Sequence, residues 1–229
     1  MTVSIILPVL NEAPYIERLL NRLLEGGAGH ITDLIVVDGG STDGTQQLAQ
    51  RAGAQVLHAP QRGRAKQMNH GVAHSTGQLL YFVHGDTLPP KSYMQDVLQA
   101  VQEGFPIGGF RFKLDSPNPL LRINSWMTRF DFLWCRGGDQ TLFVTRQLFH
   151  ELGGYNPNFL IMEEYDLMIR ARKNHPFKII QKDVLVSARK YERNGYLRVQ
   201  MANLVAFNMF RWGWPQAAIF QTYRKMLRQ

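Results

Sequence analysis

The sequence contains a single cysteine, Cys135, in 229 residues. One cysteine excludes an internal disulfide and any zinc site built on several thiolates. A lone cysteine is more often a small buried apolar residue than a nucleophile. The shortage of cysteine suits a reducing compartment, so the cytoplasm is the expected location.

Long apolar runs are also missing. No stretch of about 18 apolar residues occurs, and the longest apolar tract, 197–210, is interrupted by arginine, glutamine and asparagine. Residue 1 leads directly into a strand pattern, without the basic region and cleavage site of a signal peptide. We therefore predict no membrane-spanning segment. A peripheral position at the inner face of the membrane stays open.

Acidic residues are scarce relative to basic ones, with 18 Asp and Glu against 26 Lys and Arg, a net charge of +8. This excess favours an anionic partner without distinguishing a nucleic acid, a phospholipid surface or a diphosphate. Hydrophobic residues make up 45% of the chain, which is enough for a sizeable core and argues against intrinsic disorder.

The first half of the chain alternates strand and helix patterns. Strands are predicted at 3–9, 34–37, 55–58 and 79–83, and helices at 14–24, 42–51 and 65–74. This order implies parallel pairing through right-handed crossovers. The second half is less regular, with strands at 108–114 and 141–145, and helical patterns at 120–133, 147–152, 164–173 and 196–228. Neither repeats nor linkers interrupt the sequence, so a single α/β domain over 1–229 is expected.

Four polar clusters occur where predicted strands end or helices begin, at 8–12, 38–44, 62–64 and 84–86. In open parallel sheets, ligands bind beyond the carboxyl ends of the strands. Each cluster alone is a weak signal, since 38–44 is also typical of a loop with a helix cap. All four clusters in such positions indicate one binding site.

These clusters belong to an ordered set of motifs. The set comprises IILPVLNE (5–12), VVDGGSTDGT (36–45), GRAKQMNHG (63–71), FVHGDTLP (82–89), GGDQ (137–140), LGGY (152–155) and MEEYDL (162–167). Over about residues 3–190 the chain resembles family 2 glycosyltransferases with the GT-A fold. GGDQ and SARK (187–190) resemble the branch labelled rSAM/selenodomain-associated transferase.

The resemblance implies a GT-A-like fold, with a Rossmann-type, mostly parallel sheet flanked by helices and a helical C-terminal extension. It implies a nucleotide-sugar-binding half over about 1–110, an acceptor and catalytic half over about 111–190, and C-terminal helices over about 191–229. The implied activity is metal-dependent, inverting transfer of a sugar from a nucleotide-sugar, with a UDP-sugar favoured, to an acceptor hydroxyl.

The resemblance also assigns residues to the nucleotide-sugar: Pro8, Leu10, Asn11, Glu12, Asp38, Arg62, Arg64, Asn69 and His84. The carboxylate of Asp38 is suited to accept a hydrogen bond from N3–H of uracil. Arg62 and Arg64 are suited to the diphosphate, although a solvated basic turn explains them equally simply.

The metal motif of the family is Asp-x-Asp, and here it reads His84-Gly85-Asp86. Asp86 matches the metal-binding carboxylate, and a hard oxygen ligand suits Mg²⁺ or Mn²⁺. His84 stands where the first aspartate is usual, and we predict that it contacts the ribose or the metal. This departure leaves the identity of the metal open.

The resemblance places the catalytic carboxylates at Glu163 and Glu164, with Glu164 as the general base in place of the more usual aspartate. Two acids at a helix start also complement the helix dipole, which is the simplest explanation without the other motifs. Asp139 and Gln140 are predicted to line the acceptor side.

The C-terminal segment mixes aromatic and basic residues. Such a helix suits a membrane surface carrying a lipid-linked acceptor, although core packing with a solvated face is the more frequent explanation. Two other functions stay open at this stage. One is a nucleotidyltransferase, and the other a non-catalytic basic module for anionic lipid or nucleic acid. No nucleic-acid-binding motif supports the nucleic acid, so none is expected as a partner.

Overall fold

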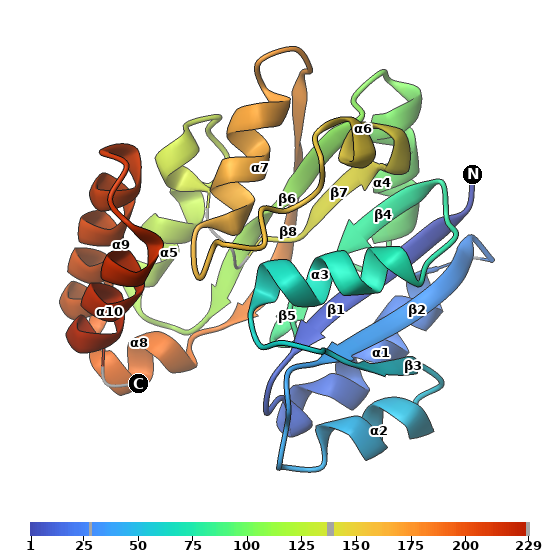
Figure 1. Ribbon diagram of the computed structural model, residues 1–229, viewed down its shortest axis with the longest axis horizontal. Helices are drawn as coiled ribbons and strands as arrows, with labels where there is room; N and C mark the ends of the chain where they lie inside the picture. Colours follow the sequence, from blue (N-terminus) through green and yellow to red (C-terminus); the bar gives the residue numbers. More distant parts are fainter. Residues whose placement is uncertain (28, 137–139, 228–229) are drawn as a thin grey trace.

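The computed structural model describes residues 1–27, 29–136 and 140–227. Its centre is an eight-stranded sheet with the order β3-β2-β1-β4-β7-β6-β8-β5 (Figure 1). The strands are β1 (Val3–Val9), β2 (Ile31–Asp38), β3 (Gln55–His58), β4 (Leu79–Phe82), β5 (Thr87–Leu88), β6 (Ile107–Asp115), β7 (Leu142–Thr145) and β8 (Phe177–Ser187).

The α/β prediction is confirmed, and the sheet is mixed. Strands β3, β2, β1 and β4 are parallel, as the alternating first half predicted. β7 pairs antiparallel with both β4 and β6, whereas β6 and β8 are parallel. The carboxyl ends of β1, β2 and β4 therefore share one edge of the sheet.

Helices cover both faces of the sheet (Figure 1). α1 (Ala13–Gly26), α2 (Thr45–Arg51) and α4 (Tyr93–Gln102) contribute to the core on one face, and α3 (Arg64–Ala73), α6 (Arg146–Glu151) and α7 (Glu163–Ala171) to that on the other. The remaining α-helices are α5 (Pro119–Met127), α8 (Arg189–Asn194), α9 (Tyr196–Arg211) and α10 (Gln216–Met226), and a short 3₁₀ turn covers Leu133–Cys135.

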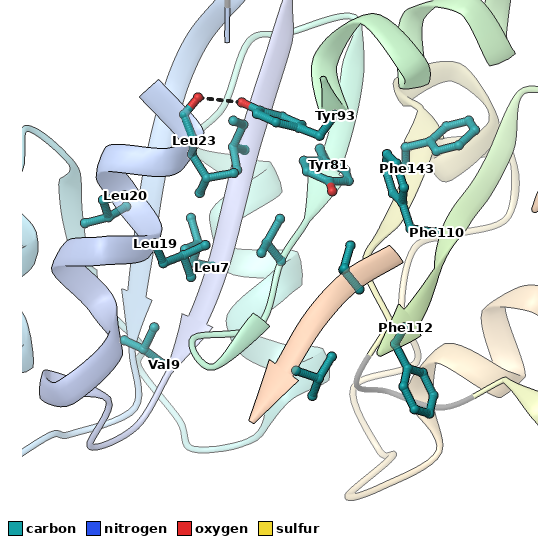
Figure 2. Packing of buried hydrophobic residues seen from close by; sticks show 14 of the residues in the cluster. Leu7, Val9, Leu19, Leu20, Leu23, Tyr81, Tyr93, Phe110, Phe112 and Phe143 are labelled. Carbon is teal, nitrogen blue, oxygen red and sulfur yellow. Dashed lines mark hydrogen bonds between the residues drawn. The ribbon is translucent and has the colours of Figure 1, made fainter. Parts of the chain in front are cut away.

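On the α1 face of the sheet, the core is built from apolar residues that the helix period places on one side of α1. Leu19, Leu20 and Leu23 of α1 are buried against alternate residues of β1, because successive strand residues point to opposite faces. Figure 2 shows this packing, in which the Tyr93 hydroxyl donates a 2.7 Å hydrogen bond to the carbonyl oxygen of Leu23. The hydrogen bond satisfies a phenol that is otherwise enclosed by apolar side chains.

The sequence patterns did not predict four of the observed elements: β5, α4, β8 and α8. β5 has only two residues, too few to create a period. In β8 the alternation breaks at three consecutive exposed residues, 181–183. These lie opposite a register shift in β6 between Phe110 and Arg111. A bulge leaves a residue unpaired and so disrupts the period of two on which strand prediction depends.

All the described strands belong to one continuous sheet, and the single domain over 1–229 stays a prediction. The internal boundaries near residues 110 and 190 stay predictions. Within the described part of the chain, no helix combines the length and the apolar character needed to cross a bilayer.

Candidate active site

The clusters at 8–12, 38–44 and 84–86 follow the ends of β1, β2 and β4, at one edge of the sheet. β1 leads through α1 to β2 on one side, and the chain later returns through α3 to β4 on the other side of β1. Crevices form where successive connections leave a sheet in opposite directions, and ligands bind in them.

Asp38 organises the loop after β2. Its carboxylate accepts hydrogen bonds from the backbone N–H groups of Gly40 and Ser41, from the Ser41 hydroxyl and from the Gln46 amide. Burial alone would raise the pKa of Asp38, but these hydrogen bonds outweigh it and lower the pKa. The carboxylate is therefore ionised and held in one orientation, with most of its acceptor capacity already used.

The first loop is tied to the second through Asn11, which adopts a left-handed backbone conformation with φ 56°. Its side-chain oxygen accepts from the backbone N–H of Thr42, and its own N–H donates to the Ser41 hydroxyl. Pro8 is buried at the end of β1, and Leu10 is 46% exposed beside it. The predicted nucleotide-binding loops thus form one connected surface.

Arg62 and Asn69 differ in where they lie. Arg62 is exposed and lies over the Asp38 loop, since a Cβ added at Gly40 would come within 3.4 Å of its guanidinium. Asn69 lies on α3, and both ends of its amide bond the backbone of Tyr155. The amide of Asn69 therefore joins α3 to the chain segment around Tyr155.

His84 and Glu164 form a buried pair. Nε2 of His84 donates a 3.0 Å hydrogen bond to Oε1 of Glu164, and both side chains are almost inaccessible to solvent. Burial would lower the pKa of His84, but Glu164 outweighs it and raises the pKa. Burial would raise the pKa of Glu164, but Arg64 and His84 together lower it to about 2. Glu164 is therefore held as a carboxylate that accepts the hydrogen bond of His84.

Glu163 is fully buried beside Arg64, the first residue of α3, whose Nε lies 2.8 Å from Glu163 Oε1. Burial raises the pKa of Glu163 to about 7, although Arg64 opposes this shift. Neither carboxylate oxygen of Glu163 makes a hydrogen bond among the described residues. The two adjacent glutamates thus have opposite pKa shifts, because Glu164 has a histidine partner as well as the arginine.

Folding stability is expected to fall as the pH rises from about 4.5 to about 7. In this window the folded protein keeps a proton on Glu163 that the unfolded chain has lost, so the stabilisation is complete below 4.5 and lost above 7. Glu163→Gln carries no titrating proton and should remove this slope, worth up to about 3 kcal/mol. Thermal unfolding of both proteins from pH 5 to 8 measures it. Equal slopes would contradict the assignment.

Asp86 and Glu12 share a partner that the sequence patterns did not assign. Nη2 of Arg189, at the start of α8, bonds Oε1 of Glu12 and lies 3.2 Å from Oδ2 of Asp86. The guanidinium also lies 5.2 Å from the ring centre of Tyr15. The SARK stretch was part of the resemblance, but it carried no information on which side chains Arg189 meets.

Residues next to these carboxylates hold the arrangement together. The backbone N–H of Ser187 donates to the carbonyl oxygen of Asp86, which fixes the end of β8 against the loop after β4. A Cβ at Gly85 would lie 2.6 Å from Cγ of Glu12, so only glycine fits there. Burial raises the pKa of Glu12 despite its ion pair, and its Oε2 is buried without a hydrogen bond among the described residues.

The described residues offer limited support for a metal. They contain no group of three or more His, Cys, Asp or Glu side chains that would hold a metal ion. Asp86 supplies one hard oxygen ligand, while Nε2 of His84 is already bonded to Glu164. Mg²⁺ is commonly held by one or two carboxylates together with substrate phosphates. Asp86 would hold a metal here together with the phosphates of a donor, and the buried Oε2 of Glu12, which makes no hydrogen bond among the described residues, lies in the same cluster.

On the predicted acceptor side, Asp139 lies outside the described residues. Gln140 is buried, and its amide accepts from Arg136 at 3.0 Å and donates to the carbonyl oxygen of Cys135 at 3.2 Å. Arg136 is itself buried and also donates to the backbone carbonyls of Thr128 and Phe130. In the structure, the amide of Gln140 is therefore used to hold its own segment.

Comparison with curated proteins finds related enzymes. A glucosyl-3-phosphoglycerate synthase of Mycolicibacterium smegmatis is 34% identical over 97 residues, 39% of this chain and 32% of that protein. A PGL/p-HBAD biosynthesis glycosyltransferase of Mycobacterium bovis is 29% identical over 189 residues, 75% of this chain and 70% of the relative. The match therefore spans about a third of the synthase.

Solved structures share the fold. The synthase of Mycobacterium tuberculosis with Mn²⁺, uridine diphosphate and phosphoglyceric acid superposes with a TM-score of 0.67 at 20% identity, covering 93% of this chain and 79% of that one. S. aureus TarS 1–349 with UDP-GlcNAc superposes at 0.68 and 16% identity, covering 99% and 71%. The sequence model described as "Glycosyl transferase family 2" matches residues 4–156. The chain belongs to glycosyl transferase family 2.

Proposed function

We propose that the protein transfers a sugar from a nucleotide-sugar to an acceptor hydroxyl in a single, inverting displacement that depends on a divalent metal. One observation carries the proposal. The His84–Glu164 pair and the separate cluster of Arg189 with Asp86 and Glu12 bring α7 and the start of α8 to the loop after β4, at the carboxyl edge of the parallel strands. Family membership supports the reaction class.

The loops after β1 and β2 are proposed to bind the nucleoside. Asp38 and Asn11 hold these loops in one conformation through hydrogen bonds, so the binding surface is organised before the donor arrives. A uridine donor is favoured, since neighbours of this fold bind UDP or UDP-GlcNAc.

The diphosphate is proposed to meet Asp86 through a metal, and Arg62 and Arg189 directly. When bound, a divalent ion neutralises the charge that develops on the departing nucleoside diphosphate. Arg189 lies between two carboxylates, so a phosphate that approaches Arg189 competes with Glu12 and Asp86 for the same guanidinium. Arginine suits this exchange because its planar group binds two oxygens at once.

Glu164 is proposed to accept the proton of the attacking hydroxyl. Its lowered pKa keeps it ionised at neutral pH, although a carboxylate with a low pKa is a weak base until the hydroxyl proton becomes acidic during attack. His84 is a positioning residue, because its hydrogen bond holds one oxygen of Glu164 and leaves the other for the acceptor. Attack with a base on the face opposite the leaving group inverts the anomeric centre.

The acceptor is proposed to be carried on a lipid at the membrane surface. The basic and aromatic C-terminal helices support this class of acceptor, although a synthase of the same fold is seen with phosphoglyceric acid.

The proposal is tested by thermal unfolding with UDP-, GDP- and dTDP-sugars, each with Mn²⁺, with Mg²⁺ and without metal. A donor bound at a hundred times its dissociation constant stabilises a protein by about 2.7 kcal/mol. We expect the largest shift with a UDP-sugar plus metal, and release of UDP on prolonged incubation. Pyrophosphate release from a nucleoside triphosphate and a sugar phosphate would instead indicate a nucleotidyltransferase.

A further inference from the structure

α9 is apolar on two opposite faces. Val199, Ala202, Ala206 and Met209 are buried against the protein. On the other side Leu197, Met201 and Leu204 are 77%, 52% and 55% exposed. Their spacing of four and three residues places them in one stripe along the helix. An apolar stripe on a helix normally faces a packed partner, and these exposed side chains form a second stripe that no other part of the described chain covers.

The stripe continues beyond the end of α9. Trp212 and Trp214, in the turn to α10, are 74% and 51% exposed. The stripe and these two residues are named here the C-terminal apolar surface: Leu197, Met201, Leu204, Trp212 and Trp214. In Figure 1, α9 and α10 form the outer edge of the molecule, on the side opposite β2 and β3. α9 and α10 therefore lie on the side of the molecule away from β2 and β3.

The charge of the chain is concentrated in the same region. Residues 189–229 contain eight Lys and Arg and a single acid, Glu192, so seven of the eight net positive charges lie there. Arg193, Arg198 and Arg211 are exposed on α8 and α9. The other 188 residues carry almost no net charge, so the excess of positive charge is a property of residues 189–229 and not of the chain as a whole.

We propose that the C-terminal apolar surface docks on an anionic phospholipid membrane. Leucine, methionine and tryptophan side chains enter the boundary between headgroups and acyl chains, while the arginines around them contact lipid phosphates. Tryptophan suits this boundary because it is apolar with one polar N–H. The inference deepens the proposed lipid-linked acceptor, and it does not require the donor chemistry.

The charge distribution favours a membrane over a second copy of the chain. A symmetric dimer through this surface would bring two strongly basic segments together, and like charges across an interface oppose association. A nucleic acid would attract the arginines and would stack bases on Trp212 and Trp214, but it would leave the stripe of Leu197, Met201 and Leu204 uncovered, since these side chains offer neither a planar group nor a donor. An anionic membrane matches both the charge and the apolar stripe.

The test is co-sedimentation of the full chain with vesicles of phosphatidylcholine alone and of phosphatidylcholine with phosphatidylglycerol. We expect binding only to the anionic vesicles, weakened by salt. Leu197→Glu, Met201→Glu and Leu204→Glu together should reduce the partition coefficient at least tenfold. Arg193→Gln, Arg198→Gln and Arg211→Gln together should reduce it about a hundredfold. Leu24→Glu, at an exposed leucine of α1, is the matched control and should bind as wild type.

Thermal unfolding of each variant shows whether it folds, since all substituted positions are exposed. Equal binding to neutral and anionic vesicles, or full binding by the triple glutamate variant, would overturn the proposal. So would a wild-type dimer that the triple variant converts to a monomer, because a second copy would then cover the face. Donor-induced stabilisation is measured without vesicles, so failure of docking and failure of glycosyl transfer are separate results.

Discussion

Glu164→Gln is expected to lower the turnover of sugar transfer by about 10²–10⁴-fold. The amide keeps the shape of the side chain, and its oxygen still accepts from His84, but it cannot take the proton of the acceptor hydroxyl. Donor binding should stay close to wild type, because the base acts on the acceptor in the transition state. Turnover with saturating donor, and donor-induced thermal shift, measure the two quantities separately.

Asp166→Asn is the matched control for this experiment. Asp166 lies in the same first turn of α7, and its carboxylate is paired with Arg170 at 2.6 Å. Its loss should change stability slightly and turnover little, because the pair is partly exposed and i,i+4 pairs contribute only a few tenths of a kcal/mol. A Glu164→Gln protein with full turnover would show that the base is another residue.

Asp86→Ala is expected to abolish the metal dependence of donor binding and to reduce transfer by about a thousandfold, the equivalent of several kcal/mol of lost charge stabilisation. Asp86 is the carboxylate proposed to hold the metal. Its removal also frees Arg189 from one of its two partners. Donor turnover measured against Mn²⁺ concentration gives the result. Full, metal-dependent activity in this variant would show that the metal site was assigned wrongly.

Arg189→Ala separates the metal from the arginine. If Arg189 binds the diphosphate, the KM for the donor should rise about tenfold, as expected for the loss of one charge-assisted contact, while metal dependence persists. If it only screens Asp86 from Glu12, metal should bind more tightly and the KM for the donor should not rise. Asp86→Ala and Arg189→Ala therefore differ in the metal titration, since the first variant should lose its metal dependence and the second should keep it.

The sequence placed Asp38 and Asp86 in one region because the ends of parallel strands must share an edge, whereas Glu164, at the start of a helix, was assigned by the family resemblance. Local patterns are sufficient for this step, since a strand and the loop after it are neighbours in the chain. The pairing of His84 with Glu164 could not be predicted from local patterns. These residues are 80 positions apart, and nothing in either local pattern says that an imidazole in the metal motif meets the proposed base.

The sequence also did not predict which partners the polar side chains bond. Asn69 and Gln140 fall in motifs that suggested ligands, yet their amides bond nearby backbone groups in the structure. A polar side chain can meet partners from several chain segments, and only the packed structure selects one. The partner of Asn69, Tyr155, is 86 residues away. Arg189 was missed for the same reason, because its partner Glu12 is 177 residues away.

The sequence by itself determined the class of fold, the edge of the sheet where the site lies, and the concentration of positive charge in the last 41 residues. These follow from periodicity, strand order and composition, which are properties of short segments. Tertiary structure alone decided which charges meet. It buries Glu163 and Glu164 side by side with opposite pKa shifts, and it leaves the outer stripe of α9 uncovered. Burial and pairing depend on chain segments that are remote in sequence, so no local pattern records them.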